Sequence, residues 1–494
     1  MIYLTPESKI YTAASESYRW KTFIVAASAL FVLVVDMSVT TISLSKIADD
    51  LSITLRSVAW VVIISSLTMC GVMLPMGRLA DVIGRKKFHI IGLIIFTVGC
   101  FLTGLSTSLP FLLFGRFVMA FGSAICQAVA FAIIIGVFPD RQRGKALGII
   151  TTTVGLAGIV GPLMSGLLIP VIDWRGMFLL LGFSSIISLT FAYFILDEKV
   201  IGIGGNQSIL KYDWIGAILS ALFFVMLIVA ISNPFSIPWI SLVYFGIVLV
   251  ILGCLGTLIF WELRTSAPMI DVRIFLNATF SWSTSVRLLA FTGNSAVFFL
   301  MPIFVQSFLG LSPMYAGFTL FSTSAGIAIS SLFSGRLSDK HGFNVFVVSG
   351  ITLTLVTGVL FAQVDGNTDL RFLISMLFFN GIGMGLWMAP NMTATLGTVS
   401  RNSHATFSAL LNLIRNIGTA IGQALATAVI TGVMLVKGAE VELHNLAQQS
   451  TPLVQDSFLL GWKLAYWLLA VVMFLALFSA LVLMLKTRNI KVSN

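Results

Sequence analysis

The sequence predicts an all-α membrane protein that crosses the bilayer many times. Of its 494 residues, 58% are hydrophobic and only 10% are charged, whereas a soluble domain typically contains about 25% charged residues. Apolar runs of roughly 20 residues recur along the chain, and this is the length that a helix needs to cross the hydrocarbon core. Short polar or charged connectors separate these runs.

We identify fourteen such runs, which fall into a group of six, a pair, and a second group of six. Each is read as one transmembrane helix. In order, they cover residues 22–45, 57–77, 88–106, 109–137, 145–170, 176–196, 213–232, 239–261, 282–308, 314–334, 343–362, 370–398, 404–436 and 461–485.

The basic residues are distributed unequally between the connectors. Basic residues in the first turn of a span are counted here with the adjoining connector. With the N-terminus in the cytoplasm, the inner connectors and tails then hold 20 of the 29 Lys and Arg residues, and the outer connectors hold six. The other three are Arg116, Arg287 and Arg415, which fall within predicted spans. Because cytoplasmic connectors are enriched in Lys and Arg, we expect both termini to be cytoplasmic. The net charge of +10 then reflects topology and not nucleic-acid binding.

A short motif occurs twice, each time after the second span of a group of six. It reads "GRLADVIGRKK" at 77–87 and "GRLSDKHG" at 335–342. This repeat predicts two parallel six-helix bundles, an arrangement suited to transport around a cavity at the membrane midplane. The predicted segments are a cytoplasmic tail (1–21), the first bundle (22–196), a linker region with two extra helices (197–281), the second bundle (282–485) and a cytoplasmic tail (486–494).

Asp36 is the one carboxylate, of nineteen Asp and Glu residues, that lies deep in a predicted span. By helix geometry it lies about 14 Å from the outer end of the first span, and Arg116 lies about 10 Å from the outer end of the fourth. An arginine in hydrocarbon needs a partner, and a carboxylate is the best one available. Asp36 can then alternate between a paired, ionised state and a protonated state, which is the minimum needed for proton coupling. The alternative is a static buried ion pair that fixes packing.

The connector at 77–87 combines a small residue, an acid and several basic residues. Gly77 allows one helix end to approach its neighbour closely, and Asp81 can accept hydrogen bonds from a helix N-terminus and pair with an arginine. Arg78, Arg85 and Lys86 can then clamp the cytoplasmic side in one state. The alternative is that these charges only set the topology.

Together these motifs resemble the major facilitator superfamily, and within it the fourteen-span drug:proton antiporter family. The resemblance covers nearly the whole chain. Besides the 77–87 loop, it rests on the first-span stretch "VDMSVTTISL", the fourth-span Arg116, "GLAGIVGPLMSG" (155–166), "APMIDVRIF" (267–275), "MPIFVQSFLGLSPMYAG" (301–317) and "NLIRNIGTAIG" (412–422). Four positions depart from the family patterns: Ser45, Met119, Ala120 and Ser165.

The resemblance implies roles for three groups of residues. Asp36 and Arg116 would couple transport to protons, since the first and fourth spans line one cavity in this superfamily. The gating loop would stabilise the outward-facing state through Gly77, Arg78, Asp81, Gly84, Arg85 and Lys86, with Arg336 and Asp339 in the second copy. The antiporter motif would seal the protein against proton leak through Gly158, Gly161, Pro162 and Gly166, although small residues at these positions are equally suited to simple helix packing.

Polar and aromatic residues within the spans are candidates for a substrate cavity. They are Gln127, Asn294, Asn380, Trp387, Asn391, Asn412 and Arg415. Any one of them is more often a helix–helix contact than a ligand contact. Because the spans of the second bundle contain no carboxylate, neutral, monocationic or anionic amphipathic substrates fit this cavity better than dications.

The function that these observations predict is proton-coupled export of amphipathic small molecules by alternating access. A dedicated exporter of one metabolite, siderophore or lipid would share every motif and is therefore an open alternative. An uptake symporter or a non-transporting sensor fits less well.

We expect no enzymatic activity, because no nucleotide-binding glycine loop and no triad or metal spacing is present. We also expect no cofactor, no bound metal, a monomer, and a location in the cytoplasmic (inner) membrane of a bacterium. The outer loop 437–460 is either a small lid or a simple connector.

Overall fold

The computed structural model describes residues 15–53, 55–58, 60–139, 142–201, 212–233, 235, 237–238, 241–266, 268–311, 313–400, 403–439 and 451–492. Throughout these residues the chain forms helices joined by short connectors, with no strand among them. The predicted all-α fold class is therefore confirmed. Residues 202–211 of the predicted linker region and residues 440–450 of the predicted outer loop lie outside the described residues.

The helices follow the predicted spans closely along the chain. The long ones are α2 (Glu16–Asp50), α4 (Trp60–Ile83), α5 (Arg85–Gly104), α6 (Leu109–Val137), α7 (Arg143–Ile195), α9 (Trp214–Ser232), α10 (Leu242–Arg264), α11 (Ala278–Ile303), α12 (Pro313–His341), α13 (Phe343–Phe361), α14 (Leu370–Leu396), α15 (His404–Val436) and α16 (Pro452–Val492). The short elements are α3 (Leu55–Val58), α8 (Glu198–Ile201), a 3-10 turn η3 (Val272–Leu276) and a π-helical turn η4 (Phe304–Phe308) that continues α11.

One element, α7, covers two of the predicted spans. It is 53 residues long, which corresponds to about 80 Å of helix, far more than the roughly 30 Å of a hydrocarbon core. Asp173 interrupts it with a φ of 62° and a ψ of 169°, so α7 is two helices joined at a kink. Among the described residues, thirteen helices are long and apolar enough to span a membrane, with α7 counted once. A total of fourteen crossings stays a prediction.

The predicted outer loop 437–460 is shorter than expected. Helix α16 begins at Pro452, nine residues before the predicted start of the last span. This first part of the helix carries polar residues such as Gln455 and Asp456. A span predicted from hydropathy ends at such polar residues. The helix itself can continue past them, outside the hydrocarbon region.

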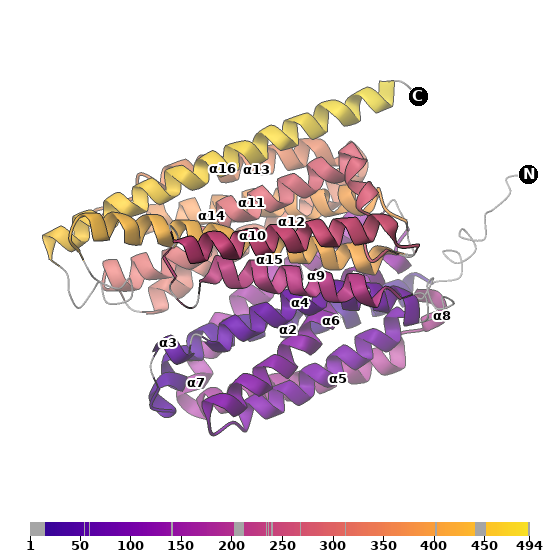
Figure 1. The fold of residues 1–494 in the computed structure, drawn as a ribbon, viewed down its shortest axis with the longest axis horizontal. Helices are drawn as coiled ribbons and strands as arrows, with labels where there is room; N and C mark the ends of the chain where they lie inside the picture. The colour runs from indigo at the N-terminus through magenta and orange to yellow at the C-terminus, as the bar shows by residue number, and fades with distance from the viewer. Residues whose placement is uncertain are drawn as a thin grey trace, which may run out of the picture. The chain divides into compact units, whose positions relative to one another are not determined.

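The chain divides into two compact units. The first comprises residues 1–274 and 399–413, and the second comprises 275–398 and 414–494. In the first unit α2 packs on α7, and α6 packs on both α4 and α5. The extra helices α9 and α10 lie side by side, and α9 packs on α4 of the same unit (Figure 1).

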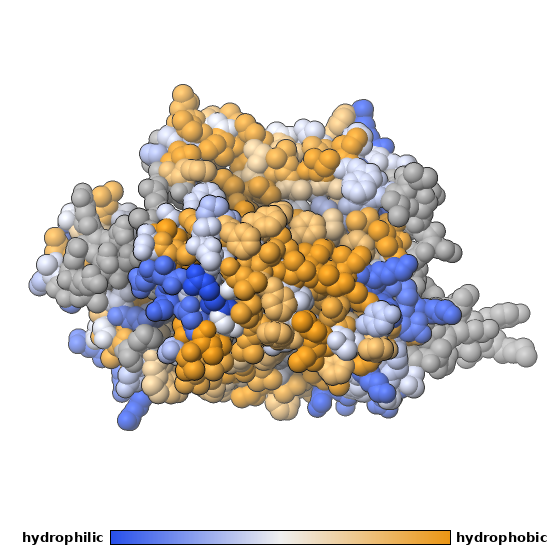
Figure 2. All heavy atoms as spheres, turned by 90° about the horizontal axis from the view of Figure 1, so that it is seen from below, coloured by the Kyte–Doolittle hydropathy of each residue, from blue (hydrophilic) through white to orange (hydrophobic). Residues whose placement is uncertain are grey.

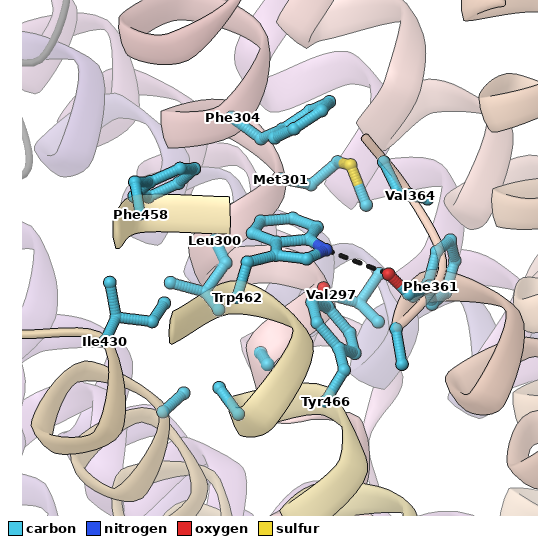
Figure 3. Close-up of a cluster of buried hydrophobic side chains, with 14 of the residues drawn as sticks. Val297, Leu300, Met301, Phe304, Phe361, Val364, Ile430, Phe458, Trp462 and Tyr466 are labelled. Atoms are coloured by element: carbon cyan, nitrogen blue, oxygen red, sulfur yellow. Dashed lines mark hydrogen bonds between the residues drawn. The ribbon is translucent and has the colours of Figure 1, made fainter. Parts of the chain in front are cut away.

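The core of the second unit contains an aromatic cluster centred on Trp462 (Figure 3). The indole of Trp462 is fully buried and its Nε1 donates a hydrogen bond of 2.8 Å to the carbonyl oxygen of Phe361. Phe304 and Tyr466 lie against it, with ring centroids 4.8 Å and 4.7 Å away. Since large aromatic side chains dominate core energetics, this cluster holds α11, η4, α13 and α16 together.

The outer surface is rich in exposed hydrophobic side chains. Figure 2 shows one face that is covered largely by such residues. Leu242 is 87% exposed, and Val171 and Phe194 are each 78% exposed. A water-soluble protein rarely exposes so much contiguous apolar surface, whereas a lipid-facing surface requires it. The protein is therefore a multi-pass membrane protein.

Candidate functional site

Asp36 and Arg116 form a buried ion pair in the first unit. Nη1 of Arg116 on α6 lies 2.8 Å from Oδ1 of Asp36 on α2. Both residues are buried, at 7% and 3% exposure. The structure thus brings together the two residues that the sequence places at comparable depth.

Two neutral hydroxyl groups and one sulfur atom also bond to this pair, the sulfur being that of Met119, which accepts from Nη1 of Arg116 at 3.2 Å. Thr40, one turn further along α2, donates to Oδ1 of Asp36 at 3.2 Å. The Nε atom of Arg116 donates to the Ser65 hydroxyl of α4 at 3.2 Å. The guanidinium group also lies 5.5 Å from the centre of the Phe178 ring of α7. Four helices therefore contribute to the site. A change in the charge of Asp36 should alter the contacts among all four.

The antiporter motif of α7 packs at one position on α2, the helix that carries Asp36. A Cβ on Gly161 would come within 2.7 Å of Cβ of Ser38, two residues after Asp36. Gly158 and Pro162 are half-buried, and Gly166 is exposed with no atom within 4 Å of an added Cβ. Close helix approach therefore depends on Gly161, and Gly166 does not take part in it.

The predicted connector 77–87 is almost wholly helical: residues 77–83 end α4, residues 85–87 begin α5, and Gly84 alone joins the two helices. Gly84 adopts a φ of +124°, which favours glycine, and a Cβ there would clash with the carboxylate of Glu198. Gly342, the matching glycine of the second copy, has a φ of +86° and likewise precedes a helix. The two copies of the motif therefore share a backbone conformation as well as a sequence.

Asp81 of this loop is the acceptor of a dense set of hydrogen bonds. Its Oδ1 lies 2.9 Å from Nη2 of Arg85, and both side chains are buried. Its Oδ2 accepts from the backbone N–H and the hydroxyl of Thr406, both at 2.9 Å, and Oδ1 accepts from the Ala405 N–H at 3.3 Å. Asp81 therefore caps the positive N-terminal end of α15, whose first residues belong to the first unit.

Gly77 explains how α4 comes so close to α15. A Cβ at this position would lie 2.7 Å from Cβ of Ala409 and 2.9 Å from the carbonyl oxygen of Ala405. Any larger residue would push the two helices apart and lengthen the bonds to Asp81.

The remaining basic residues of the gating motif have separate surroundings. Lys86 lies over the ring of Tyr193 at 5.8 Å. Arg78 is half-buried and interacts electrostatically with Tyr212 and Glu262 near the extra helices. In the second unit Arg336 is exposed and Asp339 is half-buried.

Most of the predicted cavity residues take part in helix packing. Asn380 donates to Oδ1 of Asn294 and to the Thr357 hydroxyl, both at 2.9 Å, and Asn294 donates to the Met384 sulfur. Asn391 donates to the Ser283 carbonyl of α11. Gln127 and Asn412 donate within their own helices, to the Ser123 hydroxyl and the Ser408 carbonyl. Trp387 is fully buried and Arg415 is half-buried. The structure therefore distributes these residues over both units, with Gln127 and Asn412 in the first.

One polar cluster escaped the sequence analysis. At the ends of α9 and α10, Asp213 accepts from Nε1 of Trp261 at 2.9 Å, and Glu262 accepts from the Ile270 N–H at 3.3 Å. The Tyr212 hydroxyl donates to the Pro75 carbonyl of α4 at 3.0 Å. Burial raises the pKa of Tyr212, and Asp213 raises it further. The sequence does contain a signal for this cluster: Tyr212 and Asp213 stand at the start of one predicted span, and Trp261 and Glu262 stand at the end of the next.

Comparison with known proteins identifies the family. A sequence profile described as Major Facilitator Superfamily matches residues 26–423 and 284–493. The chain belongs to the Major Facilitator Superfamily, so it is a membrane transporter. Because the family and its curated relatives are transporters, the prediction of a non-enzyme is confirmed.

Individual relatives are distant and differ in what they carry. The chain is 26% identical over 469 residues to the riboflavin transporter RibZ of Clostridioides difficile, covering 95% of this chain and 98% of that one. It is 26% identical over 415 residues to the multidrug resistance protein Stp of Mycobacterium tuberculosis, covering 83% and 75%. The human organic anion transporter MFSD10 has a similar fold, with a TM-score of 0.62, 13% identity, and coverage of 95% and 100%.

Proposed function

We propose that this transporter is a proton-coupled exporter of amphipathic small molecules, of the multidrug type and of the fourteen-span drug:proton antiporter branch. The observation that carries the proposal is the buried ion pair between Asp36 and Arg116. Ionisable groups inside a membrane are costly and are characteristic of proton and substrate pathways. Relatives named as multidrug resistance proteins support the substrate class.

The pair has two chemically distinct states. When Asp36 is ionised, its Oδ1 accepts from Arg116 and Thr40. A proton on the carboxylate removes its charge and weakens the bond to Arg116, which keeps its bond to Ser65. Proton binding therefore changes how α2 is attached to α6, and this is a two-state element that a proton gradient can bias.

The gating loop supplies the conformational part of the cycle. Asp81, through its bonds to the first turn of α15 and to Arg85, closes the cytoplasmic side in the outward-facing state. Transport then requires this set of bonds to break and reform. Gly161 keeps α7 tight against α2 near Asp36, and this close packing limits proton leak in the absence of substrate.

A second candidate is a dedicated transporter of one endogenous compound. The likeness to a riboflavin transporter over nearly the whole chain favours it. It would use the same proton site and the same gate, and it would differ only in the breadth of substrates carried. In either case we propose a monomer in the cytoplasmic membrane of a bacterium, driven by the proton gradient without a cofactor.

The test uses purified protein in liposomes that are loaded at acidic pH and diluted into neutral buffer. An antiporter exchanges internal protons for external substrate, so fluorescent amphipathic compounds should accumulate inside. Accumulation should vanish when an ionophore collapses the pH gradient. Accumulation that is independent of the gradient would rule out proton-coupled export, and accumulation of a single compound from a broad panel would favour the dedicated transporter.

A further inference from the structure

Two arginines lie well inside the helices of the second unit. Arg287 is in α11 and Arg415 is in α15, about 14 Å and 17 Å from the first residues of their helices. Arg287 is 3% exposed and Arg415 is half-buried. Arginine at such depth is costly in a membrane protein, so two of them in one unit call for a function.

The contact between α11 and α15 places these two residues at the same level. A Cβ on Gly418 would lie 2.7 Å from the Leu288 carbonyl oxygen and 3.2 Å from Cβ of Phe291, and one on Gly422 would meet Thr292. Later residues of α15 therefore contact later residues of α11, so the two helices run parallel at this contact. Arg415 precedes Gly418 by about one turn, which brings it level with Arg287. The two charges interact electrostatically.

Two neighbouring cations repel each other, and the repulsion grows in surroundings of low dielectric constant. The predicted spans of the second bundle contain no Asp or Glu. A bound anion would offset this repulsion. The planar guanidinium group presents paired N–H donors that match a carboxylate or a phosphate.

Aromatic side chains adjoin the same position. The Arg287 guanidinium lies 5.3 Å from the centre of the Phe291 ring. Phe291 packs edge-on against Trp387, with ring centroids 5.2 Å apart. Trp387 is fully buried, and its Nε1 has no hydrogen-bond partner among the described residues. A buried donor without a partner is costly, so this Nε1 is available to an acceptor on a ligand.

We propose that Arg287 and Arg415 bind the anionic group of an amphipathic substrate, a carboxylate or a phosphate, and that Phe291 and Trp387 pack against its apolar part. This proposal rests on the export function proposed above and assigns it a substrate class. Because Arg287 is almost fully buried, substrate reaches it when the site opens during alternating access.

The test measures binding of three probes that share one aromatic body: pyrenebutyrate (anionic), pyrenebutyramide (neutral) and pyrenebutyl-trimethylammonium (cationic). Energy transfer from tryptophan to pyrene reports binding to the full-length protein in nanodiscs. Wild type should bind the butyrate about tenfold more tightly than the amide, as expected for charge-assisted hydrogen bonds. R287Q and R415Q should each remove most of this preference and leave amide binding unchanged.

Three further variants keep the experiment decisive. R287K and R415K preserve the charge and should retain part of the preference, and R371Q, which changes an exposed arginine of the same unit, should retain all of it. Equal binding of butyrate and amide by wild type would overturn the proposal, even if the Gln variants fail to fold. A preference that survives both Gln substitutions would also overturn it.

Failure of the anion site is distinguishable from failure of the export function. Proton-linked flux with the cationic probe alone would overturn the anion site and leave proton-coupled export intact. Butyrate binding that depends on both arginines, without proton-linked flux of any probe, would support the anion site and contradict the export function.

Discussion

Gly161 of α7 lies directly against Ser38 of α2, so that a Cβ at Gly161 would come within 2.7 Å of Cβ and 2.8 Å of Oγ of Ser38. Ser38 is two residues from Asp36, the residue that carries the proton in the proposed mechanism. The antiporter motif therefore packs closely on the helix that carries the proton site, on a different side of that helix from Asp36. Changes in the packing of α7 should affect the ion pair by displacing α2.

The first prediction concerns this contact. G161V should lower the thermal unfolding temperature and increase proton leak, because overpacking a close contact costs about 1–3 kcal/mol. The matched control is G166V, since Gly166 has no atom within 4 Å of an added Cβ. Thermal unfolding in detergent and passive proton entry into liposomes are the two measurements. Equal unfolding temperatures and equal proton leak in the two variants would show that the contact of Gly161 with Ser38 is not required for tight packing.

The second prediction concerns the buried pair of Asp81 and Arg85. D81N should lower stability by about 3–5 kcal/mol, because Arg85 then stays buried without its counter-charge. D81N should also abolish transport, since the bonds that cap α15 are lost. Adding R85Q to D81N should restore part of the stability and none of the transport.

The control for this double-mutant cycle is T406V, which removes one hydrogen bond to Asp81 and leaves the backbone donors in place. We expect a loss of about 1 kcal/mol for T406V. Simple additivity of D81N and R85Q would contradict a coupled pair, and normal transport by D81N would contradict the proposed gate.

The third prediction concerns the junction between the extra helices and α4. Y212F removes the hydrogen bond to the Pro75 carbonyl and should cost about 1 kcal/mol of stability. Because the pKa of Tyr212 is raised in the folded protein, its contribution is present below pH 10 and is lost as the pH rises above that value. The difference in unfolding temperature between wild type and Y212F should therefore shrink above pH 10. A difference that grows with pH would contradict the assigned cause.

Hydropathy along the chain predicted the fold well, because a helix in lipid satisfies its own backbone hydrogen bonds and needs only a long apolar run. Residues 109–137 and 404–436 were predicted as spans and are α6 and α15 with the same bounds. The extension of α16 and the joining of two spans in α7 were missed. Both depend on polar residues at helix ends, where hydropathy carries little information.

The ion pair of the candidate site was predictable from the sequence, because a charged side chain within a membrane is stable only with a partner of opposite charge. Asp36 had Arg116 as a partner at matching depth, and the structure pairs them. In contrast, the contact of Asn380 with Asn294 joins residues 86 positions apart. The cluster of Tyr212, Asp213 and Glu262 likewise depends on how α9 and α10 pack. Such non-local contacts have no periodic pattern in one sequence.

The central claim is that Asp36 carries the proton, and proton release on substrate addition tests it most directly. Reconstituted vesicles are titrated with a panel of amphipathic cations, anions and neutral compounds while the pH of the medium is followed, with wild type compared against D36N. We predict that at least one compound evokes proton movement by wild type and none by D36N, with both proteins folded to the same extent. Proton movement of equal size in D36N would make Asp36 a structural charge and would contradict the mechanism.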